Sequence, residues 1–280
     1  MIYLPILGAL AEGVATTWEK MILRDKKIDS KCYVTLAFLF AVFAMIPFVY
    51  FSWKIDSSAL ELKNIIIFAL VIIFSIKANL LGVYSLRHTK LTNIEPARLL
   101  QPLFVILLAI IFSFFFDSGL YEKNLNVIIP ALIACAALIF SHVKKNRIIF
   151  NKYFMAMIFA SFFFALELVI SRIILEYYSP LTFYILRCFF IAMFGLILFR
   201  PDFGIINKKI KIEIMIISFV WVIGRLIMYY GYVYLGVIST TLIFMLAPVF
   251  IYIFAWKVLK EKISWKNIVA SIIIIGCVVY

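Results

Sequence analysis

The sequence predicts an all-α integral membrane protein whose ten transmembrane helices form two inverted five-helix repeats. The composition is the first observation, because 66% of the 280 residues are hydrophobic and only 15% are charged, whereas soluble globular proteins are about half apolar and a quarter charged. The second is that apolar runs of about 17 to 24 residues recur along the whole chain, each long enough to cross a hydrocarbon layer about 30 Å thick as a helix. The third is a weak internal repeat.

The predicted connections are short, at most about a dozen residues, and this excludes a soluble ATPase, kinase or nucleic-acid-binding domain. The net charge of +13 is therefore not interpreted as a nucleic-acid footprint. The predicted spans are 2–23, 33–53, 65–85, 93–116, 125–141, 153–175, 180–199, 212–234, 238–258 and 264–280.

The placement of Lys and Arg predicts an orientation for these spans. The odd-numbered connections, counted with the flanking Lys257 and Lys266, carry 18 of the 27 cations, whereas the even-numbered connections carry 3. Because short basic loops resist translocation, we expect the odd connections to be cytoplasmic and both termini to be non-cytoplasmic. The cell (inner or plasma) membrane is the expected location.

The first span, 2–23, lacks the basic n-region and cleavage site of a signal peptide, so we expect it to be retained. Its carboxylates Glu12 and Glu19 share one helical face with Thr16, since positions i, i+4 and i+7 lie together. A deep carboxylate can exchange a proton during transport, because desolvation favours its neutral form. It can equally be a structural partner of Lys77, and the pattern does not decide between these roles.

The third span, 65–85, holds Lys77 about twelve residues from its start, too deep for the ammonium to reach either surface easily. A charge at mid-bilayer costs about 2.5–3.5 kcal/mol even on insertion scales, which makes it a candidate functional residue. We expect Lys77 to face a cavity that binds anionic groups. The alternative is an internal ion pair that fixes helix packing.

The fourth span, 93–116, begins with LTNIEPARLLQPLF. Asn93 suits an N-cap, and Glu95 suits the first turn, where the helix dipole favours a carboxylate. Arg98 is one turn deeper on the same stripe as Glu95 and Gln101, so these three residues are candidates for a gate or for the mouth of a pathway. The fifth span, 125–141, carries no charge.

The predicted second repeat covers 152–280, after a first repeat at 1–143 and a basic cytoplasmic linker at 144–151. Each half holds an odd number of spans, so the second half must enter the membrane in the opposite sense, as in many secondary transporters. A shift of 146 residues aligns Pro102 with Pro248.

The sixth and eighth spans contribute two further deep charges. Glu167 lies one turn from Ser171, and it can be functional or structural. Arg225 lies deep in span 212–234, on a stripe of Trp221, Tyr229 and Tyr232. An arginine between aromatic rings suits a carboxylate or phosphate, although such rings also pack commonly against neighbouring helices.

The last two spans resemble the closing helices of an EamA-type transporter of the drug/metabolite transporter superfamily. The residues that carry the resemblance are Gly236, Ser239 and Thr240, then Ala247-Pro248, then the basic loop Lys260-Glu261-Lys262, and Gly276 in the last helix. The segment SPLTFYILRCFF (179–190) is similar to the family's seventh helix, and the resemblance implies a role for its Arg187. It also implies ten helices and membrane transport. Family members generally have cytoplasmic termini, opposite to the orientation expected from the charges.

Within the spans, six cations stand against four carboxylates, and an anionic or zwitterionic solute would balance the excess. The cations are Lys20, Lys77, Arg98, Arg172, Arg187 and Arg225, and the carboxylates are Glu12, Glu19, Glu95 and Glu167. Lys20 and Arg172 lie near helix ends and are expected to reach toward the surface.

We therefore expect a secondary transporter that moves an amino acid or another small carboxylate-bearing solute by alternating access, with no cofactor, metal or nucleic acid. The expected drive is a gradient of protons or another ion, exchange, or the solute's own gradient. The expected solute site comprises Lys77, Arg225, Glu12, Glu19, Glu167, Trp221, Tyr229 and Arg187. The alternatives are a membrane enzyme acting on lipid-linked substrates and a non-transporting assembly protein. An enzyme would require a clustered acidic or His/Cys motif, and His88 and His142 belong to none. The cysteines at 32, 135, 188 and 277 show no metal or disulfide spacing.

Overall fold

The computed structural model describes residues 3–23, 28–89, 97–116, 120–121, 123–142, 151–257 and 265–279. These parts are helical and contain no β-strand, which confirms the predicted all-α class; they include one isolated β-bridge. The helices of the first half are α1 (Tyr3–Ile22), α2 (Ser30–Ser52), α3 (Leu62–His88), α5 (Leu100–Phe115) and α6 (Leu125–His142). Those of the second half are α7 (Lys152–Ile174), α8 (Pro180–Phe199), α9 (Lys208–Tyr234), α10 (Val237–Phe244), α11 (Ala247–Lys257) and α12 (Trp265–Val279).

Five of the described helical segments are long and apolar enough to cross a membrane. They are Ser30–Ser52, Leu62–His88, Lys152–Tyr177, Pro180–Phe199 and Val237–Phe254. Leu100–Phe115, Leu125–Phe140 and Ile268–Val279 are shorter apolar helices. Large apolar side chains such as Phe114 and Ile272 are exposed on the outside, as expected of helices whose solvent is lipid. The number of crossings stays a prediction.

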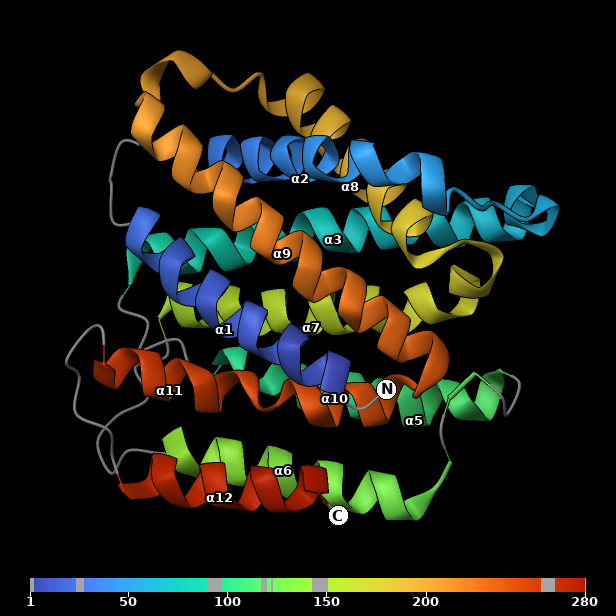
Figure 1. Ribbon diagram of the computed structural model, residues 1–280, viewed down its shortest axis with the longest axis vertical. Coiled ribbons are helices and arrows are strands. Elements are labelled where there is room, and N and C mark those ends of the chain that lie inside the picture. The colour runs from blue at the N-terminus through green and yellow to red at the C-terminus, as the bar shows by residue number, and fades with distance from the viewer. Residues whose placement is uncertain are drawn as a thin grey trace.

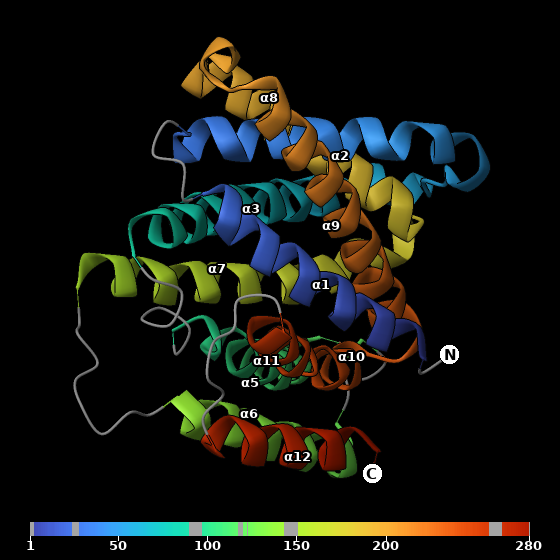
Figure 2. The same cartoon turned by 60° about the vertical axis from the view of Figure 1, so that its left-hand side comes forward.

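The helices stack in layers, and their packing repeats between the two halves (Figure 1). α3 of the first half packs on α7 of the second half. Its counterpart in the second half, α9, packs on α1 of the first half. The pairs α2–α8 and α6–α12 each join equivalent helices from the two halves. Figure 2 shows the same layers from another side, with α6 and α12 beside each other at one edge. This exchange of partners is what a two-fold relation between repeats produces.

Local sequence explains where several helices begin. Asp29, Asn151 and Asn207 are N-caps whose side chains accept hydrogen bonds from backbone N–H groups of the first turn, which otherwise lack partners. At α8, Ser179 is the cap and Pro180 follows it, where a missing N–H costs little. The Asn93 cap predicted for the fourth span lies outside the described residues.

The ninth span, predicted as one helix over 238–258, is two helices. α10 ends at Phe244 and α11 begins at Ala247. Pro248 has no N–H to donate to the carbonyl of Phe244, and its ring disfavours helical continuity from the preceding turn. The region still forms one apolar segment long enough to cross a membrane, Val237–Phe254, with an interruption at residues 245 and 246.

Two connections lock together at one end of the molecule. Ile55, between α2 and α3, pairs with Tyr178, between α7 and α8, in an antiparallel bridge. The bridge is flanked by backbone hydrogen bonds from Asp56 N to Tyr177 O (2.8 Å) and from Ser179 N to Lys54 O (3.1 Å). In Figure 1 the start of α1 and the end of α12 lie toward this same end. We call these contacts the loop clamp.

Candidate functional site: a polar cavity between the repeats

A cavity of about 120 Å³ lies between the helices of both halves. Seven helices line it: α1, α2, α3, α5, α7, α8 and α9. Its lining includes Glu19 and Leu86, near the ends of α1 and α3 that lie away from the loop clamp, and it extends inward to Arg187. The cavity therefore runs from the middle of the helix bundle toward the end that carries the basic connections.

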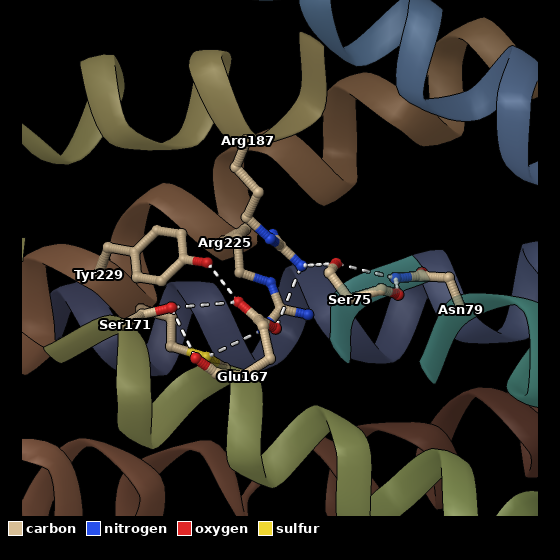
Figure 3. Close-up of polar contacts among 8 residues, drawn as sticks. Ser75, Asn79, Glu167, Ser171, Arg187, Arg225 and Tyr229 are labelled. Carbon is tan, nitrogen blue, oxygen red and sulfur yellow. Dashed lines mark hydrogen bonds and ion pairs between the residues drawn. The ribbon is translucent and has the colours of Figure 1, made fainter. Parts of the chain in front are cut away.

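The deepest polar group is a closed network around Glu167 and Arg187 (Figure 3). Glu167 is 0% exposed and Arg187 is 1% exposed, and the Glu167 Oε2 to Arg187 Nη2 distance is 3.1 Å. The Tyr229 hydroxyl donates to Glu167 Oε1 at 2.8 Å, and Arg187 Nη2 donates to Ser75 Oγ at 2.5 Å. Further hydrogen bonds of this kind help a buried pair to be stable, although the buried Arg187 Nε has no hydrogen-bond partner among the described residues. The pairing with Glu167 places Arg187 at the cavity wall.

Arg225 also lines the cavity, but in a different way. Its guanidinium lies near Glu167 in Figure 3, yet no described carboxylate comes within 4 Å of it, and its one hydrogen bond goes to Met228 Sδ at 3.5 Å. A sulfur atom is a weak acceptor. Trp221, one turn earlier on α9, lines the same cavity. Arg225 therefore has donor capacity left for a ligand.

A second ion pair separates the main cavity from a smaller one. Arg98 Nη2 lies 3.8 Å from Glu12 Oε1 and donates to Thr16 Oγ1 at 2.6 Å. About a fifth of each charged side chain is exposed, and the buried Arg98 Nη1 has no hydrogen-bond partner among the described residues. Gln101 lines both cavities beside this pair. The pair is looser and wetter than the pair of Glu167 and Arg187.

Glu19 is a cavity-lining carboxylate that forms no ion pair within 4 Å with any described residue. Tyr33 of α2 and Arg98 line the same cavity. The cavity thus contains one unpaired carboxylate, Glu19, and one unpaired guanidinium, Arg225.

The expectation for Lys77 is corrected by the structure. Lys77 is exposed and does not line the cavity; its Nζ lies over the ring of Phe163, 5.3 Å from the centroid, on the outer face of α3 and α7. The reason is helical phase, because Ser75 and Asn79 face inward and Lys77 lies about 200° around the helix from each. Neither the shared cavity with Arg225 nor the alternative ion pair with Glu12 or Glu19 is present among the described residues.

The other predicted residues lie elsewhere in the structure or outside the described residues. Tyr229 is fully buried and belongs to the Glu167 network rather than to the cavity lining. The half-buried Lys20 donates from Nζ to the carbonyls of Leu86 and Thr89 at the end of α3. Arg172 is buried, contrary to the expectation that it reaches toward the surface. Glu95 lies outside the described residues.

The charges at the cavity are fewer than those counted over the spans, because Lys77, Lys20 and Arg172 do not line it. Among the described residues its lining holds three arginines and two carboxylates, which are Arg98, Arg187, Arg225, Glu12 and Glu19. Glu167 lies outside the lining and pairs with Arg187. When Glu167 is included, the charges around the cavity are balanced.

Sequence reasoning missed several polar residues at the site, chiefly Tyr33, Asn79, Ser161 and Tyr184. Asn79 had a signal, because it follows Ser75 by one helical turn and precedes Gly82 on the same inward stripe of α3. Tyr33 and Tyr184 lie near helix starts, where tyrosine is common in membrane helices, so nothing in the sequence distinguished them. Among the described residues no group of three or more His, Cys, Asp or Glu side chains could hold a metal ion.

Comparisons with known proteins agree with this architecture. The sequence profile of the EamA-like transporter family matches residues 1–140 and again residues 151–280. A solved structure, described only as the crystal structure of a protein, is similar to this chain with a TM-score of 0.65 at 13% identity, over 99% of this chain and 93% of the other. That likeness concerns the fold alone. A search of curated proteins found no match.

Proposed function

The chain belongs to the EamA-like transporter family, of the drug/metabolite transporter superfamily, and from this premise we propose that it is a secondary transporter for a small zwitterionic solute of the amino-acid type. Membership makes it a multi-pass membrane protein of two repeats with a transporter's function. The proposal adds the kind of solute, the mechanism of transport and the orientation in the membrane.

The observation that carries the proposal is the pair of unsatisfied charges in one cavity. Arg225 has no carboxylate partner within 4 Å and Glu19 has no cationic partner within 4 Å among the described residues, although both line the same space. A solute carboxylate fits the fork of a guanidinium, and a solute ammonium fits a carboxylate. A zwitterion satisfies both charges without adding net charge to a balanced site, which favours it over a simple anion.

Alternating access is supported by the unequal closure of the two ends. The loop clamp joins the α2–α3 and α7–α8 connections at one end, whereas the cavity extends toward the other end. If the basic connections are cytoplasmic, this conformation faces inward, and transport requires the loop clamp to open. In this proposal both termini are non-cytoplasmic and the protein resides in the cell membrane.

The proposed function is tested by uptake into proteoliposomes with a panel of amino acids, organic acids and sugar phosphates. We expect flux of at least one amino acid above empty liposomes, and a reduced rate for both Arg225→Met and Glu19→Gln. Flux of none of these compounds in protein that binds none of them would overturn the proposal.

The loop clamp offers a separate test of alternating access. A disulfide between cysteines introduced by Ile55→Cys and Tyr178→Cys should abolish uptake under oxidising conditions and restore it after reduction, while solute binding persists in both states. The single variant Ile55→Cys is the matched control. Full uptake with the disulfide formed would show that the loop clamp does not open during transport.

A further inference from the structure

Gly82 of α3 is the one glycine in the lining of the main cavity among the described residues. It is buried, and it lies one helical turn after Asn79 and one turn before Leu86, which also line the cavity. Residues three and four apart on a helix lie on the same face. The face of α3 that meets the cavity therefore carries a side chain before and after Gly82, and only backbone at Gly82 itself.

Other buried glycines of this protein are explained by close packing. Small residues in membrane helices usually let neighbouring helices approach each other closely. An ideal Cβ would lie 2.5 Å from Thr35 Oγ1 at Gly195, and 2.6 Å from Thr240 Cγ2 at Gly231. Neither position has room for a side chain unless its neighbours move.

Gly82 differs from these glycines because a side chain would fit there. Its ideal Cβ would lie 3.8 Å from Ala160 Cβ and 3.8 Å from Phe164 Cε2, which are ordinary van der Waals distances. The residue lies inside the helix α3, where glycine is less favourable than alanine. Neither the packing of α3 nor its backbone conformation therefore requires a glycine at this position.

The wall of the cavity around Gly82 carries no charge among the described residues. α3 and α7 pack on each other, and their residues in the lining are Asn79, Gly82, Val83, Leu86, Met157, Ser161 and Phe164. The charged lining residues come from α1, α8, α9 and the turn before α5. Glu19 and Arg225, which are proposed to hold the two charges of the solute, lie on the packed pair α1 and α9. The α3–α7 wall is thus an uncharged surface for the rest of the solute.

Phe164 gives the space beside Gly82 an apolar boundary, since it lines the cavity and lies 3.8 Å from the ideal Cβ. We propose that Gly82 is a specificity-determining residue: its missing side chain leaves a recess in the cavity wall, and an apolar side chain of the solute lies in that recess against Phe164. The chemical class of the solute rests on the proposed function, whereas the recess itself does not.

The recess is tested without any solute by labelling a cysteine introduced by Asn79→Cys, in the full chain in detergent. Asn79 is half-buried and lines the cavity one turn from Gly82, and its side chain donates within α3, to the Ser75 carbonyl at 2.8 Å. The rates of a small and a bulky methanethiosulfonate reagent are compared, after subtraction of the labelling of the chain that retains Asn79. Gly82→Val should slow the bulky reagent by about tenfold or more and the small reagent much less, because added methyl groups fill the recess.

Gly276→Val on α12 is the matched control for this substitution. No heavy atom lies within 4 Å of the ideal Cβ of Gly276, and Gly276 does not line the main cavity. It should leave the rates of both reagents unchanged. Equal rates of the bulky reagent in Gly82→Val and Gly276→Val would overturn the proposal, and so would a cysteine at position 79 that the small reagent cannot label.

Thermal unfolding separates a recess from a packing role for Gly82. Gly82→Ala should keep or raise Tm, because its Cβ meets ordinary contacts and alanine favours a helix. Gly231→Ala should lower Tm, because its Cβ would lie 2.6 Å from Thr240 Cγ2. A comparable loss of Tm in both variants would show that the fold requires Gly82 and would overturn the proposal.

Calorimetric binding of alanine and leucine tests which part of the solute enters the recess. Gly82→Val should weaken the binding of leucine by about tenfold or more and that of alanine much less, since a methylene group in an apolar pocket contributes about 10–200-fold. Gly276→Val should change neither affinity. Equal losses for both amino acids in Gly82→Val, or binding of alanine without leucine to the wild type, would overturn the proposal. Binding of neither amino acid, with slowed labelling by the bulky reagent in Gly82→Val, would count against the proposed function alone.

Discussion

The two ion pairs near the cavity are made of the same residue types, yet their surroundings differ. Glu167 and Arg187 are almost completely buried and 3.1 Å apart, and each makes one further hydrogen bond, to Tyr229 and to Ser75 respectively. Glu12 and Arg98 are 3.8 Å apart and about a fifth exposed. The first pair is expected to fix the position of α8 relative to α7, because separating it would leave a buried charge. The second pair is expected to separate at a smaller cost, because it is longer and partly exposed.

The largest expected effect comes from breaking the closed pair. Glu167→Leu leaves Arg187 as an uncompensated buried charge and removes the acceptor of the Tyr229 hydroxyl, so we expect a loss of about 3–5 kcal/mol in the free energy of unfolding. Denaturant titration in mixed micelles measures this loss. The double variant Glu167→Leu/Arg187→Met should recover part of it, because two apolar side chains leave no charge unpaired. Purely additive effects of the two substitutions would contradict the coupling.

A smaller effect is expected at the loose pair. Arg98→Met should change the free energy of unfolding by about 1 kcal/mol or less, since partly exposed ion pairs contribute little. Glu12→Gln should change the free energy of unfolding by a similar amount, and the same denaturant titration compares the two variants. A loss as large as that of Glu167→Leu would show that the second pair is structural too and would remove the contrast.

The smallest effect is expected at Lys77, which lies outside both pairs. Its exposed side chain has one ring contact, with Phe163, and a charge on the lipid-facing side of a span is costly. Lys77→Met should therefore keep solute uptake unchanged and keep or raise Tm, and Lys77→Arg is the matched control. Loss of uptake in Lys77→Met, with retention in Lys77→Arg, would return Lys77 to the transport pathway.

Much of the fold was predictable, because long apolar runs and turn residues mark spans directly. The spans at 2–23 and 180–199 match α1 and α8 closely. The interruption before Pro248 was also within reach, since the missing N–H is a property of proline alone. The direction in which Lys77 points could not be predicted. The helix α3 is apolar around most of its circumference, so the sequence does not mark which side meets another helix.

The residues of the candidate site also include some that the sequence could predict and some that it could not. Arg225 and Trp221 were predicted from a stripe on one helix, which is local information, and both line the cavity. The partners Glu167 and Arg187 come from different helices, so their 3.1 Å contact depends on how α7 and α8 are placed in the bundle. Tyr33 of α2 and Glu19 of α1 line one cavity for the same reason. The sequence can identify candidate charged residues, but a structure is needed to show which of them pair across helices.

The central claim is that Arg225 and Glu19 recognise the two ends of one zwitterion, and calorimetric binding of three matched ligands tests it most directly. The ligands are an amino acid that the wild type transports, its methyl ester and its N-acetyl derivative. The wild type should prefer the free amino acid by about 10–100-fold over each derivative, since a hydrogen bond to a charged group contributes about 1.5–3 kcal/mol. Arg225→Met should lose the preference over the ester alone, and Glu19→Gln the preference over the N-acetyl compound alone. Equal affinity of the wild type for all three ligands, or unchanged preferences in both variants, would contradict the account.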